Sequence, residues 1–291
     1  MFNLEKYLPL FILPMFILGC NTGKMIVDTM DPVVEKMDQS LNKSNDVEMA
    51  RQAFPANLLL IEGLLESSPN NKRLLLAATQ GYFFYAFAFI EEENKERAKK
   101  LYLKSRDYAL DLFFDKKDDF KAALKNYNQE YFLSVLSQTD HEDVPALFWM
   151  VNSWMAWINL NLDNLDIFVD LPKIEALMNR LLLLDDSYFY GGIHLCLASY
   201  YGILSKALGG QPEKSKYHFE KAFSGSRGKL LLVHFFYAKY YAVQIQDKKL
   251  FIKTLEDILA IPDNYFPERN LLNQVIKIKA KKLLKRVEEY F

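Results

Sequence analysis

The stretch of sequence that decides the fold is residues 187–223, which reads SYFYGGIHLCLASYYGILSKALGGQPEKSKYHFEKAF. Residues 187–201 are apolar and aromatic, and residues 215–223 mix charged and apolar side chains at helical spacing. Between them, the pair Gly209–Gly210 tolerates positive φ and breaks the chain, and Pro212 suits the first turn of a new helix. The stretch therefore predicts two helices joined by a glycine turn.

The second of these helices carries a small, a large and a small residue on one face. Ser215, Phe219 and Ala222 lie four and three residues apart, which places them on the same side of a helix. Such a stripe lets a partner helix approach closely, and it is typical of the second helix of a tetratricopeptide-like hairpin. The same spacing recurs earlier, at Ala98, Tyr102 and Ser105. An ordinary antiparallel helix pair is the alternative for either stretch taken singly.

The composition favours helices along the whole chain. Only 11 glycines and 10 prolines interrupt 291 residues that are 51% hydrophobic and 14% aromatic. We therefore predict an all-α fold of tetratricopeptide-like helical-hairpin repeats, stacked as a compact right-handed solenoid with a capping C-terminal helix. The 36 basic and 37 acidic residues leave no strong overall charge, which argues against a nucleic-acid partner.

The N-terminus has the pattern of a bacterial lipoprotein signal. Lys6 precedes the short apolar run 7–18, which is followed by Gly19 and Cys20. The run is too short to span a membrane and fits the core of a signal peptide. Its end resembles a lipobox, so we expect residues 1–19 to be removed and Cys20 to be acylated, with chains such as palmitate anchoring the protein. An ordinary secretory signal is the alternative.

This signal divides the chain into three parts. We expect a signal peptide at 1–19, a lipid-anchored linker with a short helix at 20–45, and the helical repeat domain at 46–291. Within the repeat domain, residues 72–90 are apolar enough to raise the question of a membrane span. Polar residues interrupt this run, and we favour a helix covered on all sides by the repeat core.

One helix, predicted at residues 146–159, holds all three tryptophans. Its two large apolar faces require contacts on two sides, one with the repeat core and one with a neighbouring repeat or the wall of an apolar cavity. Asn152 lies between these faces and is placed to orient the polar end of a ligand. Solid core packing is the alternative. The candidate lumen-lining or ligand-binding residues are Trp149, Asn152, Trp154, Trp157, Tyr190 and Tyr200.

The chain lacks the residue patterns of common catalytic and cofactor sites. The four histidines have no metal-ligand spacing to one another or to cysteine. No glycine-rich phosphate loop and no nucleophile–histidine set is evident. We therefore predict a protein that binds and does not catalyse, with no cofactor and no metal.

Several stretches together resemble a known family. They read LPKIEALMNR at 171–180, LD at 184–185 with YG at 190–191, LGGQPEK at 208–214, FEKA at 219–222, and YYA at 240–242 with QD at 246–247, beside the helix around Trp149. The set resembles TatT, the family of tetratricopeptide-like lipoproteins associated with tripartite ATP-independent periplasmic (TRAP) transporters. The resemblance runs from about 46 to about 284 and includes the lipobox. The chain departs from the pattern at Ser215, where alanine is usual, and in the turn at 225–228.

The resemblance implies a lipid-anchored protein that faces the periplasm, at the inner leaflet of the outer membrane. Its partner would be the extracytoplasmic solute-binding (P) component of a TRAP transporter, and it would channel a hydrophobic small molecule. Whether it forms a homo-oligomer is left open. The alternative is an envelope scaffold lipoprotein of the outer-membrane protein assembly type, which binds peptide segments on a polar surface. The aromatic richness of the chain favours the first.

Overall fold

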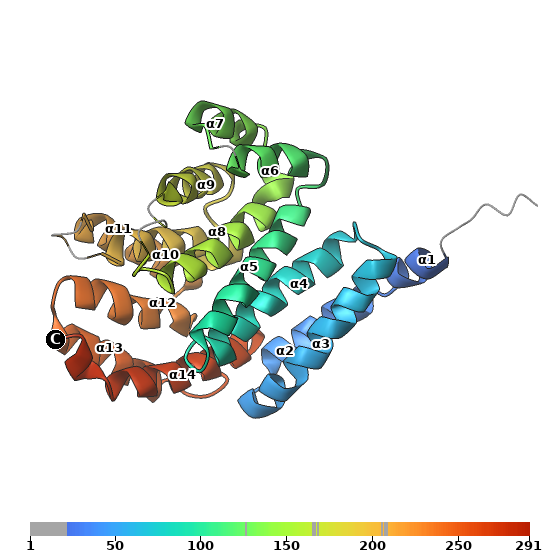
Figure 1. Ribbon diagram of the computed structural model, residues 1–291. Helices are drawn as coiled ribbons and strands as arrows, with labels where there is room; N and C mark the ends of the chain where they lie inside the picture. Colours follow the sequence, from blue (N-terminus) through green and yellow to red (C-terminus); the bar gives the residue numbers. More distant parts are fainter. Residues whose placement is uncertain (1–21, 126, 165–166, 168, 205, 207–208) are drawn as a thin grey trace, which may run out of the picture.

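The computed structural model describes residues 22–291 except 126, 165–166, 168, 205 and 207–208. Every regular element within these residues is a helix, and none is a strand, so the predicted all-α class is confirmed. The predicted signal peptide at 1–19 and the predicted acylation site Cys20 lie outside the described residues. Figure 1 shows the helices stacked in chain order, with the last ones returning toward the first.

The chain begins with three helices, α1 (Thr22–Thr29), α2 (Asp31–Lys43) and α3 (Val47–Ser67). Asp46 caps α3, because its carboxylate accepts a hydrogen bond of 2.8 Å from the amide of Met49. Helix α2 packs against α4, α14 and the short helix η7, so the start of the described chain lies beside its end. None of the side chains described in α2 is buried. This helix therefore covers the others without joining their core.

The next hairpin consists of α4 (Lys72–Tyr85) with the π-helix η1 (Ala86–Ile90), followed by α5 (Lys95–Asp111). The predicted packing stripe on α5 is confirmed, since Ala98, Tyr102 and Ser105 are all fully buried. The Ser105 hydroxyl lies 2.7 Å from the Ser153 hydroxyl of α8 and donates to the backbone carbonyl of Thr79. Small residues thus bring α4, α5 and α8 close together.

The segment from α4 through η1 is the one helix among the described residues that is long and apolar enough to cross a membrane. Just over half of its apolar window, 56%, is buried inside the protein. Its neighbours α3, α5 and α8 account for this burial. The burial supports the interpretation of 72–90 as a core helix.

A smaller group of helices follows, with η2 (Phe114–Lys116), α6 (Lys117–Lys125), α7 (Gln129–Ser137) and η3 (His141–Asp143) before α8 (Val144–Asn159). Asp143 stands at the N-cap position of α8, but its side chain makes no capping hydrogen bond to that helix. The Asp143 carboxylate instead accepts from the backbone amide of Asp140, at 2.9 Å, and from Lys116, at 2.6 Å. It therefore stabilises η3, one turn earlier.

The hairpin predicted from the opening stretch is confirmed. After α9 (Leu171–Leu184), the two helices are α10 (Tyr188–Gly202) and α11 (Pro212–Ser226). Ser215, Phe219 and Ala222 are buried against α10, and the Ser215 hydroxyl donates to the carbonyl of Ala198 at 2.8 Å. Ser215, which stands where the family pattern usually has alanine, therefore adds a hydrogen bond at the contact between the two helices.

The beginning of α10 is not a regular right-handed helix. Phe189, Tyr190 and Gly191 have φ values of 49°, 62° and 72° and form a left-handed turn. Gly225 of α11 packs against this turn, and a Cβ atom there would lie 2.7 Å from the Tyr190 carbonyl oxygen. The right-handed part of α10 therefore begins only at Gly192.

The chain ends with α12 (Leu231–Phe236), the π-helix η6 (Tyr237–Ala242), α13 (Lys248–Ala260), η7 (Pro267–Arg269), α14 (Asn270–Leu284) and η8 (Val287–Glu289). One basic residue of the last helix is buried. Lys279 is 4% exposed and pairs with Glu91 at 2.9 Å and Glu92 at 2.8 Å. These ion pairs tie α14 to the end of η1. Contacts of α14 with α2 and α3 close the stack on itself.

Candidate ligand cavity

A cavity of about 740 Å³ lies where the last helices meet the first. Its walls come from α2, α3, α4, α8, α10, α12 and the start of α14. Its volume is in the range of pockets that hold small organic ligands. Apolar side chains that are about half exposed, Val33 and Met37 on α2 and Leu60 on α3, also line it. The cavity is therefore bordered by the loosely packed helix α2 and its neighbour.

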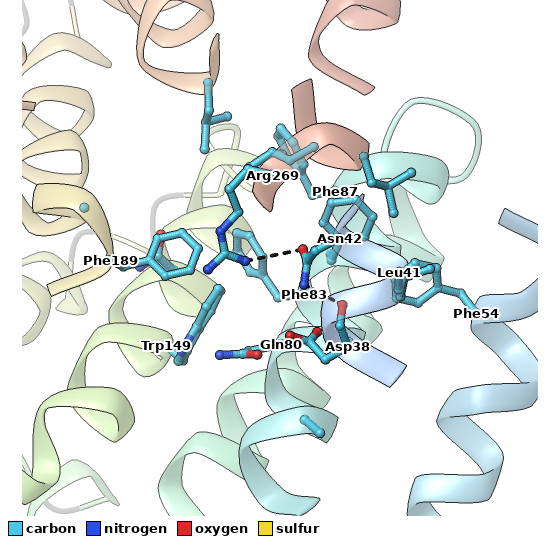
Figure 2. A pocket seen from close by; sticks show the side chains of 18 of the residues that line it. Asp38, Leu41, Asn42, Phe54, Gln80, Phe83, Phe87, Trp149, Phe189 and Arg269 are labelled. Carbon is cyan, nitrogen blue, oxygen red and sulfur yellow. Dashed lines mark hydrogen bonds between the residues drawn. The ribbon is translucent and has the colours of Figure 1, made fainter. Parts of the chain in front are cut away.

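Aromatic rings form much of the wall (Figure 2). Trp149 of α8 lies at the centre, with ring centroids 5.5 Å from Phe83 and 5.3 Å from Phe189, both in edge-on contacts. Phe87 comes from the π-helix η1, where the extra residue in the turn changes the direction of the side chains that follow. Phe54 faces them from α3. The surface is apolar and held rigid by ring-to-ring contacts.

One guanidinium group enters this apolar space. Figure 2 shows Arg269, from η7, pointing into the cavity between Phe189 and Asn42. Its guanidinium carbon lies 4.8 Å from the centroid of Phe189 and 5.6 Å from that of Tyr190. One terminal nitrogen donates to the Asn42 side-chain oxygen at 3.3 Å, and Nε is buried with no acceptor. The cavity therefore has a positively charged end with unused hydrogen-bond donors.

Two further polar side chains lie near this end, Asp38 on α2 and Gln80 on α4. Asp38 is an exposed residue of the cavity wall, and protein atoms near its carboxyl group raise the pKa of that group by desolvation, although the charge of Arg269 opposes the rise. No carboxylate of the described residues lies within ion-pair distance of Arg269, so the nearby acid does not neutralise it by contact.

A second cation, Lys239 of η6, lines another part of the cavity. It lies 5.2 Å from the centroid of the Tyr240 ring and near Glu91. Burial opposes its charge, but Tyr240 and Glu91 raise its pKa above the usual value. Glu91 also accepts from Tyr102 at 2.7 Å. This lysine therefore already has an acidic neighbour.

The six residues proposed from the sequence fall into two groups. Trp149, Asn152 and Tyr190 line the cavity. The Asn152 amide already donates to the Phe148 carbonyl at 2.8 Å, and its oxygen lies 3.5 Å from the Cys196 sulfur. Burial raises the pKa of that thiol to about 12, which makes it a packed group and not a reactive one.

The other three residues lie outside the cavity lining. Trp154 is buried and donates its indole N–H to Asp170 at 3.2 Å. Trp157 packs partly buried between the two main core clusters, and Tyr200 packs against one of them. The structure thus places these three rings in the protein core.

The polar end was missed by sequence reasoning. Arg269 follows a proline-bounded loop, and Asp38 and Asn42 belong to a short helix that carries no recognisable motif. The hydrogen bond between Arg269 and Asn42 joins positions 227 residues apart. The sequence held one relevant signal, the apolar pattern of α2, which predicts that this helix lies against the domain.

Among the described residues, no group of three or more histidine, cysteine, aspartate or glutamate side chains is placed to hold a metal ion. His194 and His218 do pair, with their Nδ1 atoms 3.0 Å apart, between α10 and α11. Neither ring lines the cavity. The described lining of the cavity is thus mainly apolar, with the charged side chains of Asp38, Lys239 and Arg269 among it.

Comparison with known proteins gives two matches. The model of a family described as TRAP transporter T-component matches residues 43–291. An uncharacterized protein of Treponema pallidum (strain Nichols) is 24% identical over 263 residues, which cover 86% of this chain and 81% of that protein. The family match includes every cavity-lining element except α2, of which only the last residue falls inside it.

Proposed function

The chain belongs to the TRAP transporter T-component family, and from that premise we propose that it binds an apolar ligand in its cavity and passes it to the solute-binding component of the transporter. The family associates the chain with a TRAP transporter, and hence with the bacterial cell envelope. The family is one of transporter components, and the role we propose is binding and handover without bond-making.

The observation that carries this proposal is the cavity itself. A volume of about 740 Å³ lined by Phe83, Phe87, Trp149 and Phe189 is more space than a close-packed protein interior leaves unfilled. Moving an apolar ligand from water into an apolar space of this kind is favourable. The ring contacts hold the aromatic part of the wall in place, so a ligand need order only the α2 side on binding.

The location that we propose is the periplasmic face of a membrane, with Cys20 acylated. The lipobox pattern and the family both support this placement. The described chain begins at α1, two residues after Cys20, and α2 follows at once. On this arrangement the anchor would attach next to the helix that borders the cavity.

Binding is tested with the full chain in detergent and the apolar fluorophore N-phenyl-1-naphthylamine. Ala77→Phe adds a ring at a cavity-lining position of α4 and should weaken probe binding by about tenfold, through loss of space. Ala122→Phe, on the exposed surface of α6, is the matched control and should bind as the wild type does. Equal binding by both variants, or no binding by the wild type, would contradict the proposal.

The partner is tested by using the wild-type chain as bait with periplasmic extract. Recovery of a TRAP solute-binding component is the expected result, and Ala77→Phe should recover it with less co-purified small molecule by native mass spectrometry. Recovery of outer-membrane assembly proteins in its place, without a bound small molecule, would assign the chain to the scaffold class.

A further inference from the structure

We propose that the ligand of this cavity is an amphipathic monocarboxylate, a single carboxylate on an unbranched apolar chain, and that Arg269 binds its head. This inference rests on the proposed function, because it needs the cavity to be a ligand site. It adds the chemical class of the ligand and the residue that recognises it.

The first step in the argument is the hydrogen-bonding state of Arg269. A guanidinium group has five N–H donors arranged in a planar fork. In this structure one of its nitrogens donates to the neutral side-chain oxygen of Asn42, at the long distance of 3.3 Å. Within the described residues, Nε, which is buried, and the second terminal nitrogen of Arg269 therefore have no protein acceptor.

The second step is the absence of a contact counter-ion. Among the described residues, no carboxylate lies within 4.0 Å of the Arg269 guanidinium. The carboxyl group of Asp38 interacts with the charge of Arg269, but desolvation raises the pKa of this carboxyl group. Asp38 therefore loses its negative charge more readily than an ordinary aspartate. The Arg269 side chain is part-buried, its Nε has no acceptor, and a ligand anion would supply both an acceptor and an opposite charge. Lys239 likewise has no carboxylate within 4.0 Å in the described part of the chain, but the charge of Glu91, which pairs with Lys279, raises its pKa.

The third step in the argument is the direction in which the Arg269 guanidinium points. The guanidinium carbon lies over the rings of Phe189 and Tyr190, and these cation–π contacts use none of its N–H groups, which stay available to a ligand. A planar carboxylate matches two parallel N–H groups of a guanidinium. Figure 2 shows the group directed into the cavity above Gln80. The geometry favours a flat, singly charged head over a bulky one.

The fourth step is what lies beyond the head. From Arg269 the cavity continues between Trp149, Phe83 and Phe87 toward Leu41 and Phe54. These walls carry no charge and favour a chain of CH₂ groups, each of which gains about 0.8 kcal/mol on burial. A cation at one end and aromatic walls along the rest together specify an amphipathic molecule.

The experiment uses displacement of N-phenyl-1-naphthylamine from the full chain by four ligands of one chain length: decanoate, decan-1-ol, decylamine and decyl phosphate. The wild type should bind decanoate about tenfold more tightly than decan-1-ol and should bind decylamine most weakly. Decyl phosphate should bind less well than decanoate. A preference for decyl phosphate would reassign the head to a phosphate and overturn the carboxylate.

Variants then locate the head. Arg269→Met should lose about tenfold in decanoate affinity and leave decan-1-ol within about twofold. Arg269→Lys keeps the charge but not the fork and should give an intermediate loss of about threefold. Lys239→Met, which removes the other cavity cation, should keep the preference for decanoate. An equal loss in Lys239→Met would move the head to that residue and overturn the assignment.

The outcomes separate this inference from the proposed function. If the fluorophore binds but decanoate and decan-1-ol compete equally, the cavity is a ligand site and the head-group inference is wrong. If none of the probes binds, both proposals fail. If Arg269→Met does not fold, Arg269→Lys decides, because an unchanged ratio of decanoate to decan-1-ol affinity in that variant overturns the role of the fork.

Discussion

At the scale of single residues, Gly225 decides how near α11 comes to the left-handed turn of α10. A Cβ atom there would lie 2.7 Å from the Tyr190 carbonyl oxygen and 3.2 Å from the Cα atom of Gly191. Both neighbours are backbone atoms and cannot rotate away. We expect Gly225→Ala to lower the free energy of unfolding by about 1–3 kcal/mol, measured by urea denaturation.

Gly63 provides the matched control for that substitution. It lies within α3, and a Cβ atom there would meet nothing within 4 Å. Gly63→Ala should therefore stabilise the protein by about 0.5–1 kcal/mol, because alanine favours a helix more than glycine does. Equal effects of the two substitutions would show that backbone crowding at Gly225 does not matter.

The pair His194–His218 predicts a loss of stability in acid. Burial lowers the pKa of both rings, and that of His218, next to His194 and Lys214, falls to about 4. The unfolded chain, with histidine pKa values of about 6.5, then binds more protons than the folded chain between pH 6.5 and 4. Stability should fall as pH drops through this window. Because His218 is only half-buried, we expect about 1–2 kcal/mol from it.

The measurement for this pair is the urea midpoint as a function of pH. In His218→Gln the slope between pH 6.5 and 4 should be shallower than in the wild type, since one proton-linked group is gone. Asp186, 3.9 Å from the His194 ring, is exposed and offsets little of the effect. A slope that does not change with the substitution would assign the acid sensitivity to other groups.

At the scale of elements, α2 is held by few contacts. Its ties include the hydrogen bond from Arg269 to Asn42, a 3.4 Å bond from Asn270 to the Lys43 carbonyl, and an exposed ion pair between Glu35 and Arg73. We expect backbone amides of 34–43 to exchange with deuterium faster than those of α4, because α2 can open without unfolding the core. Hydrogen–deuterium exchange by mass spectrometry measures this.

The same measurement should respond to ligand. A bound chain that touches Leu41 and a head that engages Arg269 would hold α2 in place, so decanoate should slow exchange in 34–43 and leave α6, far from the cavity, unchanged. Exchange in α2 as slow as in α4 without ligand would mean that the helix is a fixed part of the wall.

Helical spacing predicted the elements but not their irregularities. The run 72–90 was expected to be a single helix and ends as the π-helix η1, and α12 continues in the same way into the π-helix η6. An insertion of one residue into a turn leaves the apolar pattern of the flanking helices intact, so periodicity does not reveal it. Both π-helices contribute cavity residues, Phe87 and Lys239, whose direction therefore could not be anticipated.

At the scale of the whole molecule, the sequence was sufficient for the fold class and insufficient for the site. Ser215, Phe219 and Ala222 were placed correctly because spacing alone fixes their face. Trp149 and Tyr190 share the cavity with Arg269 only because α14 returns to the first helices, and such closure depends on distant contacts. The right-handed solenoid and the boundaries at 19 and 45 stay predictions.

The anchor gives a prediction at this scale. If Cys20 is acylated, wild-type protein expressed in a bacterial host with lipoprotein processing should partition into the membrane fraction, and its intact mass should show loss of residues 1–19 and addition of acyl chains. Cys20→Ser should appear in the soluble periplasmic fraction or keep its signal. A soluble wild type with an unmodified cysteine would rule out the anchor.

The left-handed turn at 189–191 has a consequence for how this binding site can change over generations. Asparagine or glycine at Phe189 or Tyr190 would suit the backbone but would remove a ring that lies against Arg269, and most other side chains would suit neither. Few substitutions in this turn could therefore change the ligand preference of the candidate cavity. Helix α2 buries none of its described side chains, so it should tolerate many more substitutions. We therefore expect differences in ligand preference among related proteins to arise first in α2.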